Sequence, residues 1–468
     1  MRYAAPPVGA LRFMPPQDPR KSRKVKDASK FKTKCLSSGI SASVIGKTQS
    51  EDCLFVNVFA PTNATRKARL PVYLFIQGGA FNSNGHASTD GTALIQAAGM
   101  NMIVVAPNYR VSIFGFLSHG DKLQPNNGLL DQRKQFNGFR RGSSSGGASV
   151  AFHLAAYGSR DDKLFHAASA EFISSSPIVT LEQAAYRAQG VMSQLGCTEG
   201  DVMACMRNKT SFELSAAPKT FPAPGGTKAP ISMWMPVIDG DLVRNSLWDS
   251  FSIGNFVKVP TIIGATTNEG IGFSPATSSQ AQSDGFWQAE YPMMNSSHTA
   301  NISALYSSDT TKCSTPTCFS QQLRDSYGDM RFMCSGVSFT SAMSYWMPNK
   351  TWNYWYNVQN SPCGGVTHGI QGSAIWGSGR GSLPNSYLAG GVNANITTVM
   401  QGYWASFIRS YDPNKYRYAN TSVWQAYSKT QRQRLVVGTG ARTSLQNMTQ
   451  TMQNRCDYFD SIASLVQQ

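Results

Sequence analysis

The chain has 468 residues, 41% of them hydrophobic, and its 42 Lys and Arg against 26 Asp and Glu give a net charge of +16. That apolar content is enough for a large core, and a single elaborated α/β domain often reaches this length. The sequence has no run of about 18 apolar residues, which argues against a transmembrane span. Neither an aromatic-basic stripe nor a zinc knuckle accompanies the charge, so no nucleic-acid partner is expected.

The order of apolar and helical segments predicts the fold class. Short apolar runs alternate with helical patterns, which is typical of βα units and a mostly parallel sheet. Neither a repeat nor a long linker divides the chain, so we expect a single domain over residues 1–468. Strands are expected at 54–59, 72–76, 103–107, 166–173, 260–265 and 352–358. Helices are expected at 91–98, 147–156, 181–195, 245–251 and 399–410.

Glycosylation signals indicate export. Asn-x-Ser/Thr triplets occur eight times, although such triplets also arise freely in chains rich in Asn, Ser and Thr. Residues 1–7 contain no apolar signal-peptide core. We therefore interpret the chain as a secreted, extracellular glycoprotein whose signal peptide is absent from this sequence. The triplets begin at Asn63, Asn208, Asn295, Asn301, Asn349, Asn395, Asn420 and Asn447.

The nine cysteines fit disulfides better than a metal site. None has the Cys-x-x-Cys or Cys/His spacing of a zinc site, so no metal is expected. Because nine is an odd number, at least one of Cys334, Cys363 and Cys456 should stay free or pair elsewhere. Pairs that could close a loop are Cys35 with Cys53, Cys197 with Cys205, and Cys313 with Cys318. The remaining cysteines are Cys334, Cys363 and Cys456.

Eight Lys or Arg residues lie between Arg20 and Lys34. Such a segment favours a weak attraction to acidic surfaces, such as a cell wall or a membrane. The alternative is a solvated basic loop without a partner.

The segment Gly142-Ser143-Ser144-Ser145-Gly146 has the Gly-x-Ser-x-Gly form of a nucleophile elbow. In such an elbow the serine occupies a strained strand-to-helix turn, with its hydroxyl exposed at a helix N-terminus. A Cβ at either glycine would clash with the turning backbone. Ser144 is therefore the candidate nucleophile. The alternative is a small-residue loop packed against another backbone.

A second glycine-containing segment, residues 77–81, follows the apolar run 72–76. Its backbone N–H groups are little hindered by side chains, as an oxyanion hole requires. Gly79 and Ala80 are candidate donors, with the N–H of Ser145 as the third. The alternative is an ordinary glycine turn after a strand.

A candidate base and a candidate acid follow later strands. His368 lies in a glycine-rich loop after the strand expected at 352–358, and Glu269 follows the strand expected at 260–265. Loops at the carboxyl ends of strands are where α/β enzymes place catalytic groups. An acidic residue in an Asn/Gly turn is otherwise simply solvated.

Several ordered segments together resemble the type-B carboxylesterase/lipase family, which also contains the cholinesterases, and most of all its secreted fungal carboxylic-ester hydrolases. The resemblance runs nearly end to end and implies an α/β-hydrolase fold, with a mostly parallel central sheet flanked by helices. The segments that carry it are RYAAPPVGALRF at 2–13, SEDCL at 50–54, NYR at 108–110, NGLLDQR at 127–133 and PVIDG at 236–240.

The resemblance implies roles for matching residues. Ser144 would be the nucleophile, Glu269 the acid and His368 the base, with no cofactor. The substrate would be a small-molecule or lipid ester. The oxyanion hole would comprise Gly79, Ala80 and Ser145; the disulfides would be Cys35–Cys53 and Cys197–Cys205; and Arg12 and Glu51 would form an ion pair.

The chain also departs from the family pattern. The family normally has about two dozen residues, a helix and then the central strand, where this chain has only 134–141. A buried parallel strand should be rich in Val, Ile and Leu, whereas 136–141 reads FNGFRR. Burying two arginines there without partners would be costly. We therefore expect a shortened or missing central strand before the elbow, and the short opening of the chain suggests N-terminal truncation.

Two functions follow from these observations. The first is a serine hydrolase that cleaves carboxylic esters through an acyl-serine intermediate, with Phe81, Ile375 and Trp376 lining its acyl pocket. The second is a catalytically impaired, cholinesterase-like secreted protein that serves binding or adhesion. The intact Ser, Glu and His favour the first function, and the short segment before the elbow favours the second.

Overall fold

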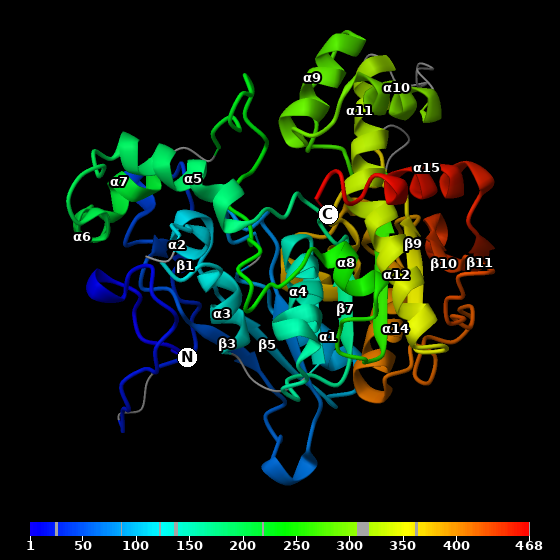
Figure 1. The fold of residues 1–468 in the computed structure, drawn as a ribbon. Helices are drawn as coiled ribbons and strands as arrows, with labels where there is room; N and C mark the ends of the chain where they lie inside the picture. Colours follow the sequence, from blue (N-terminus) through cyan, green and yellow to red (C-terminus); the bar gives the residue numbers. More distant parts are fainter. Residues whose placement is uncertain are drawn as a thin grey trace.

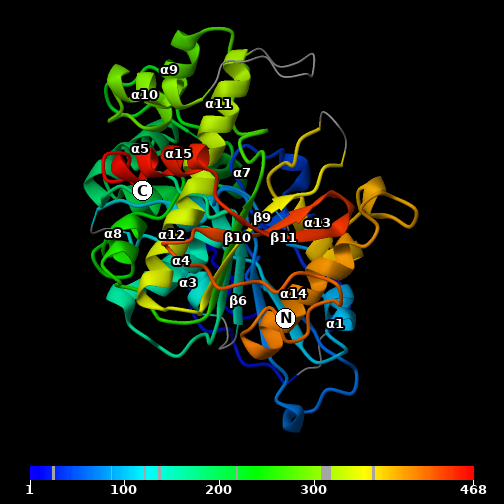
Figure 2. The same ribbon diagram turned by 90° about the vertical axis from the view of Figure 1, so that its right-hand side faces the viewer.

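A computed structural model describes residues 1–23, 27–85, 87–120, 123–134, 139–217, 220–306, 318–360 and 364–467. Within these residues nine strands form one sheet, in the order β11-β10-β9-β8-β7-β6-β4-β5-β3. Only the edge strands β3 and β11 run antiparallel to their neighbours. The expected α/β-hydrolase arrangement, a mostly parallel sheet flanked by helices, is confirmed (Figures 1 and 2). The strands are β3 (Val56–Phe59), β4 (Val72–Ile76), β5 (Ile103–Pro107), β6 (Phe139–Ser143), β7 (Ala168–Glu171), β8 (Thr261–Thr266), β9 (Thr351–Asn357), β10 (Gln433–Gly438) and β11 (Arg442–Asn447).

The sheet separates two hydrophobic cores. Because successive side chains of a strand point to opposite faces, Leu74 and Ile76 of β4 join one core, and Tyr73 and Phe75 join the other. The first core is closed by α2 (Ser112–Phe116), α3 (Asn127–Arg133), α4 (Ser145–Ser159), α5 (Leu181–Gln194), α6 (Val202–Asn208), α8 (Leu247–Ser252) and α12 (Ser335–Trp346). The second is closed by α1 (Thr92–Ala97), α13 (Gln371–Trp376) and α14 (Ile396–Ser410).

A third hydrophobic cluster forms a helical lobe above the sheet. Its helices α9, α10 and α11 lie together at the top of both views (Figures 1 and 2). The disulfide Cys334–Cys456 ties the π-helical segment Asp329–Cys334 to α15. The expected Cys313–Cys318 pair and Cys363 include residues outside the described part of the chain. The helices of the lobe are α9 (Gln280–Glu290), α10 (Ser296–Leu305), α11 (Cys318–Gly328) and α15 (Gln450–Ser461).

The central strand, expected to be shortened or missing, is present as β6 between β4 and β7. It has five residues, the same length as β4 and β5. Arg141 is fully buried in β6, but Glu171 of β7 pairs with its guanidinium. The rings of Trp376 and Tyr73 lie 5.1 and 5.9 Å from the guanidinium carbon. A buried arginine is tolerated in this strand because it has a carboxylate partner and aromatic neighbours, which corrects the expectation of a shortened or missing central strand.

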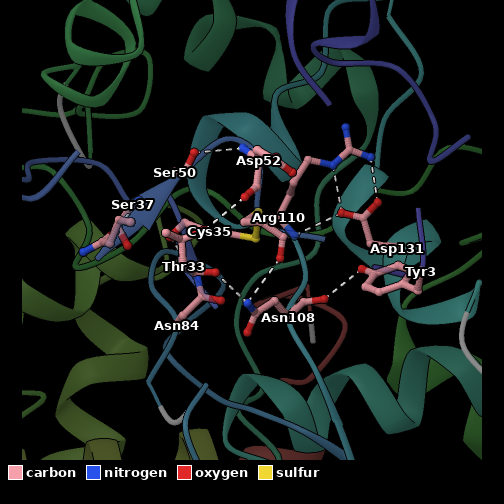
Figure 3. Close-up of a disulfide and its surroundings, with 12 residues drawn as sticks. Tyr3, Thr33, Cys35, Ser37, Ser50, Asp52, Asn84, Asn108, Arg110 and Asp131 are labelled. Carbon is pink, nitrogen blue, oxygen red and sulfur yellow. Dashed lines mark hydrogen bonds and ion pairs between the residues drawn. A yellow bond between two sulfur atoms is a disulfide. The ribbon is translucent and has the colours of Figure 1, made fainter. Parts of the chain in front are cut away.

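The N-terminal segments that carry the family resemblance form buried structural contacts. Asp131 accepts hydrogen bonds from Nε and Nη2 of the buried Arg110 at 2.8 and 2.7 Å (Figure 3). The disulfides Cys35–Cys53 and Cys197–Cys205 are both present. The expected ion pair also forms, with Nε and Nη2 of Arg12 donating to Glu51 at 2.7 and 2.6 Å.

No helix in the described part of the chain is both long enough and apolar enough to cross a bilayer.

Candidate active site

Ser144 lies at the turn between the end of β6 and the start of α4. Its backbone has φ 61° and ψ −123°, a strained conformation for a residue other than glycine. The Ser144 N–H donates to the carbonyl of Glu171 in β7 at 2.9 Å. The chain thus has the sharp strand-to-helix turn that presents a nucleophile in hydrolases of this fold.

The two glycines of the elbow are required by close backbone contacts. A Cβ on Gly142 would lie 1.7 Å from the carbonyl oxygen of Gly146. A Cβ on Gly146 would lie 2.1 Å from the carbonyl oxygen of Ile76 in β4. Both distances are far below van der Waals contact, so any side chain at either position would displace the turn.

The loop after β4 lies directly against the elbow. A Cβ on Gly78 would lie 2.9 Å from Cβ of Ser144, which shows how closely the two segments approach. Gly79 has φ 129° and Ala80 has φ 53°. Among the described residues, no carbonyl or side chain accepts a hydrogen bond from the N–H of Gly79, Ala80 or Ser145. Gly79 and Ala80 line the same cavity as Ser144, and Ser145 follows Ser144 at the start of α4.

His368 and Glu269 meet in space although 99 residues separate them. Nδ1 of His368 lies 2.5 Å from Oε2 of Glu269. The other carboxylate oxygen of Glu269 accepts the N–H of Thr266 at 2.5 Å, at the end of β8. The Glu269 side chain is 1% exposed and that of His368 is 14% exposed. A buried carboxylate thus fixes an imidazole that still reaches a cavity.

Three phenylalanine rings surround the imidazole. Phe332, Phe273 and Phe172 have ring centroids 4.6, 4.8 and 4.9 Å from that of His368. They come from the π-helical segment, the loop after β8 and the end of β7. Because these rings pack against the imidazole, they restrict its rotation and shield part of its surface from water.

One cavity of about 720 Å³ brings the expected residues together. Ser144, Gly79, Ala80 and His368 all line it, whereas Glu269 lies behind the imidazole. In the described structure no hydrogen bond joins the Ser144 hydroxyl to His368, as is common before a substrate binds. No group of three or more His, Cys, Asp or Glu side chains that could hold a metal ion occurs in the described ranges.

Beneath the elbow lies a polar network that the sequence did not reveal. The buried carboxylate of Glu171 accepts hydrogen bonds from Gln371 at 3.2 Å and from Nε1 of Trp404 at 3.1 Å, besides its ion pair with Arg141. Gln371 follows His368 by three residues and begins α13. It links the loop that carries His368 to the strand whose carbonyl holds Ser144.

The expected lining of the acyl pocket by Phe81, Ile375 and Trp376 needs correction. Phe81 packs against Phe116 at 5.0 Å, and Trp376 packs against Phe75 at 4.8 Å. With Ile375 they belong to the hydrophobic cores and do not line the cavity. Arg380, which sequence reasoning missed, does line it. Burial, followed by the charge of Arg141, lowers the pKa of Arg380 to about 10.

A search of solved structures finds the same architecture in EstA of Aspergillus niger. That structure superposes with a TM-score of 0.94 and 34% identity, covering 100% of this chain and 94% of EstA. Among curated proteins, para-nitrobenzyl esterase of Bacillus subtilis is 27% identical over 93% of this chain and 89% of its own length.

Other relatives match over a shorter part. The cAMP-regulated D2 protein of Dictyostelium discoideum is 33% identical over 297 residues, which is 58% of this chain and 54% of that protein. The chain thus spans about half the length of this curated relative. The model of the carboxylesterase family matches residues 1–136 and 141–459, with a gap at 137–140 that includes the first two residues of β6. The chain therefore belongs to the carboxylesterase family.

Proposed function

We propose that the protein is a serine hydrolase that cleaves carboxylic esters through an acyl-Ser144 intermediate. One observation carries the proposal. Ser144, in its strained turn, and His368 line the same cavity, and Glu269 holds the imidazole of His368 from behind. Family membership supports the same reaction class, since relatives include a para-nitrobenzyl esterase and a medium-chain fatty acyl-CoA hydrolase of Anas platyrhynchos.

In the first half of the proposed reaction, His368 removes the proton of the Ser144 hydroxyl as the oxygen attacks the ester carbonyl. The imidazole becomes an imidazolium, whose charge the buried Glu269 carboxylate stabilises through Nδ1. His368 then donates the proton from Nε2 to the leaving alcohol, and the acyl group remains on Ser144. In the second half, water replaces the alcohol and the same steps release the acid.

The negative charge that develops on the carbonyl oxygen needs donors that are already in place. The N–H groups of Gly79, Ala80 and Ser145 suit this role because they donate to no described protein group. Ser145 also begins α4, so the positive end of the helix dipole favours charge at this point. Removal of one such donor typically costs roughly 10²–10³-fold in rate.

We infer that the protein works outside the reducing cytosol. Its three described disulfides are of the kind that persist in secreted proteins. The substrate would then be an extracellular small-molecule or lipid ester.

Hydrolysis of para-nitrophenyl butyrate tests the proposal. Ser144→Ala should reduce kcat by roughly 10⁴–10⁶-fold. Ser143→Ala is the matched control, because it removes the neighbouring hydroxyl of the same cavity but not the one at the turn. A folded wild-type protein with no hydrolysis of any ester would instead favour the impaired binding or adhesion protein.

A further inference from the structure

A second cavity of about 260 Å³ adjoins the active-site cavity. Ser232 lines both of them, and its hydroxyl lies 3.4 Å from the carbonyl oxygen of Ala80 in the candidate oxyanion loop. The neighbouring Ile231 lines the active-site cavity. The segment 230–232 therefore separates the two cavities, so a ligand in the second cavity would lie next to the active-site cavity.

The second cavity is mostly apolar. Pro177, Val179, Met235 and Ala289 are among its lining residues. Such a surface accepts a hydrocarbon portion of a ligand and gives no hydrogen bonds to a polar one. Its volume suits a fragment of a substrate rather than a whole drug-sized molecule.

Arg187 of α5 is one of the charged residues in this lining. Its side chain is buried, with 7% of the residue exposed, and the buried Nε has no hydrogen-bond partner. Within the described residues Arg187 also forms no ion pair, and its guanidinium carbon lies 5.8 Å from the ring of its neighbour Tyr186. A buried N–H donor without an acceptor is costly unless a ligand supplies one, and the missing acceptor here is at Nε of Arg187.

The other charged groups in the cavity neutralise each other. Glu290 accepts from Nη1 of Arg331 at 3.5 Å and from the hydroxyl of Tyr327 at 3.0 Å. Burial raises the pKa of Glu290, whereas the charge of Arg331 and the hydrogen bonds from Ile231 and Tyr327 lower it. The charge of Arg187 therefore stays uncompensated by the Glu290–Arg331 pair.

We propose that this cavity is a subsite for a carboxylate, and that Arg187 selects esters that carry a second, free acid group on an apolar body. The inference deepens the proposed function and rests on it. A guanidinium matches a carboxylate with two parallel hydrogen bonds, and the apolar lining packs against the chain between the acid and the ester. The ester itself lies in the main cavity, next to Ser144.

Two pairs of substrates test the proposal. The para-nitrophenyl half-ester of glutaric acid, against neutral para-nitrophenyl butyrate, puts the carboxylate on the acyl side. The compound meta-(butanoyloxy)benzoate, against phenyl butyrate, puts it on the alcohol side. In at least one pair, Arg187→Met should lower kcat/KM for the charged ester about tenfold or more and leave the neutral ester nearly unchanged. Arg187→Lys should retain part of the preference, because it keeps the charge.

Two further variants serve as controls for the role of Arg187. Arg66→Met removes an exposed positive charge and should leave the preference unchanged. Arg380→Met removes the arginine that lines the main cavity. If Arg380→Met abolishes the preference and Arg187→Met does not, or if neither pair depends on Arg187, the proposal is overturned.

A binding measurement separates this inference from the proposed function. Calorimetry with the Ser144→Ala protein needs no catalysis and uses hexanoate and hexanol as probes. Adding Arg187→Met should weaken hexanoate binding about tenfold or more and change hexanol binding little. This outcome in a protein that hydrolyses no ester would support the subsite and contradict the hydrolase. Equal hexanoate affinity with and without Arg187 would contradict the subsite alone.

Discussion

The carboxylate of Glu269 lies 2.5 Å from Nδ1 of His368, and the N–H of Thr266 holds its second oxygen. Both oxygens of this buried group are therefore engaged, and the imidazole has only Nε2 left for proton transfer. The rings of Phe172, Phe273 and Phe332 keep it in this position.

Glu269→Gln tests the role of that carboxylate. The amide has nearly the same shape but carries no charge to stabilise an imidazolium, so kcat should fall roughly 10³–10⁴-fold with little change in KM. Glu269→Asp, which keeps the charge on a shorter side chain, should lose less. Steady-state kinetics with para-nitrophenyl butyrate check both values. A Gln variant with near-wild-type kcat would show that His368 acts without this partner.

Gly78→Ala tests the closeness of the loop to the elbow. The added Cβ would lie 2.6 Å from the carbonyl oxygen of Ser143 and 2.9 Å from Cβ of Ser144, so the loop must move away. The backbone donors would move with it, and kcat should fall roughly 10²–10³-fold. The matched control is Gly336→Ala in α12, whose Cβ would lie 3.4 Å from Cγ2 of Ile263, an ordinary contact. Equal activity of the two variants would contradict the oxyanion role of the loop.

The Arg141–Glu171 pair predicts a non-additive effect on stability. Glu171→Gln leaves the buried guanidinium of Arg141 without a counter-charge and should lower the free energy of unfolding by about 3–5 kcal/mol. The double variant Arg141→Met/Glu171→Gln removes both charges; its amide oxygen can still accept from Trp404, and its amide N–H can donate to Oε1 of Gln371, which otherwise has no partner. It should be more stable than Glu171→Gln alone. Urea denaturation of Arg141→Met, Glu171→Gln and the double variant measures their free energies of unfolding. If the loss in the double variant equals the sum of the two single losses, the pair is not coupled.

Asp329 predicts a pH dependence of stability. Burial raises its pKa from 3.8 to about 6 in the folded protein. The folded state therefore holds a proton that the unfolded state has lost between about pH 4 and 6, so this group's contribution to stability falls as pH rises through that window. Relative to wild type, Asp329→Asn should gain up to about 3 kcal/mol between pH 4 and 7. Asn can still accept from the Tyr306 hydroxyl, which lies 2.8 Å from Asp329.

Unfolding of wild type and Asp329→Asn at pH 4, 5, 6 and 7 measures the effect. Asp460, whose pKa burial also raises to about 6, gives a second variant with the same sign, Asp460→Asn. A difference between wild type and variant that stays constant over this range would contradict the prediction.

Local sequence patterns were sufficient to predict the apolar strands at the centre of the sheet. The apolar runs at β4 and β5 have the bounds that the structure shows, since strands buried on both faces read as continuous apolar segments. Strand β6 was not predicted because Arg141 argues against burial. Its partner Glu171 is 30 residues away in β7, and no local pattern reveals such a pairing.

The site was predictable where chemistry repeats as a short motif and unpredictable where it depends on packing. The elbow glycines follow from the turn itself, as the contacts of Gly142 and Gly146 show. The rings around His368 come from three distant segments, and the burial of Arg187 depends on what packs against helix α5, to which it belongs. Burial and isolation of this kind arise from tertiary structure alone.

The most direct test of the hydrolase is covalent labelling at the elbow. The purified protein is treated with a fluorophosphonate, and the modified peptide that contains Ser143, Ser144 and Ser145 is sequenced by mass spectrometry. An activated nucleophile at the turn predicts one adduct, on Ser144, which disappears in Ser144→Ala and becomes much slower in Glu269→Gln. A folded wild-type protein without an adduct on Ser144, or with equal labelling of its two neighbours, would contradict the account.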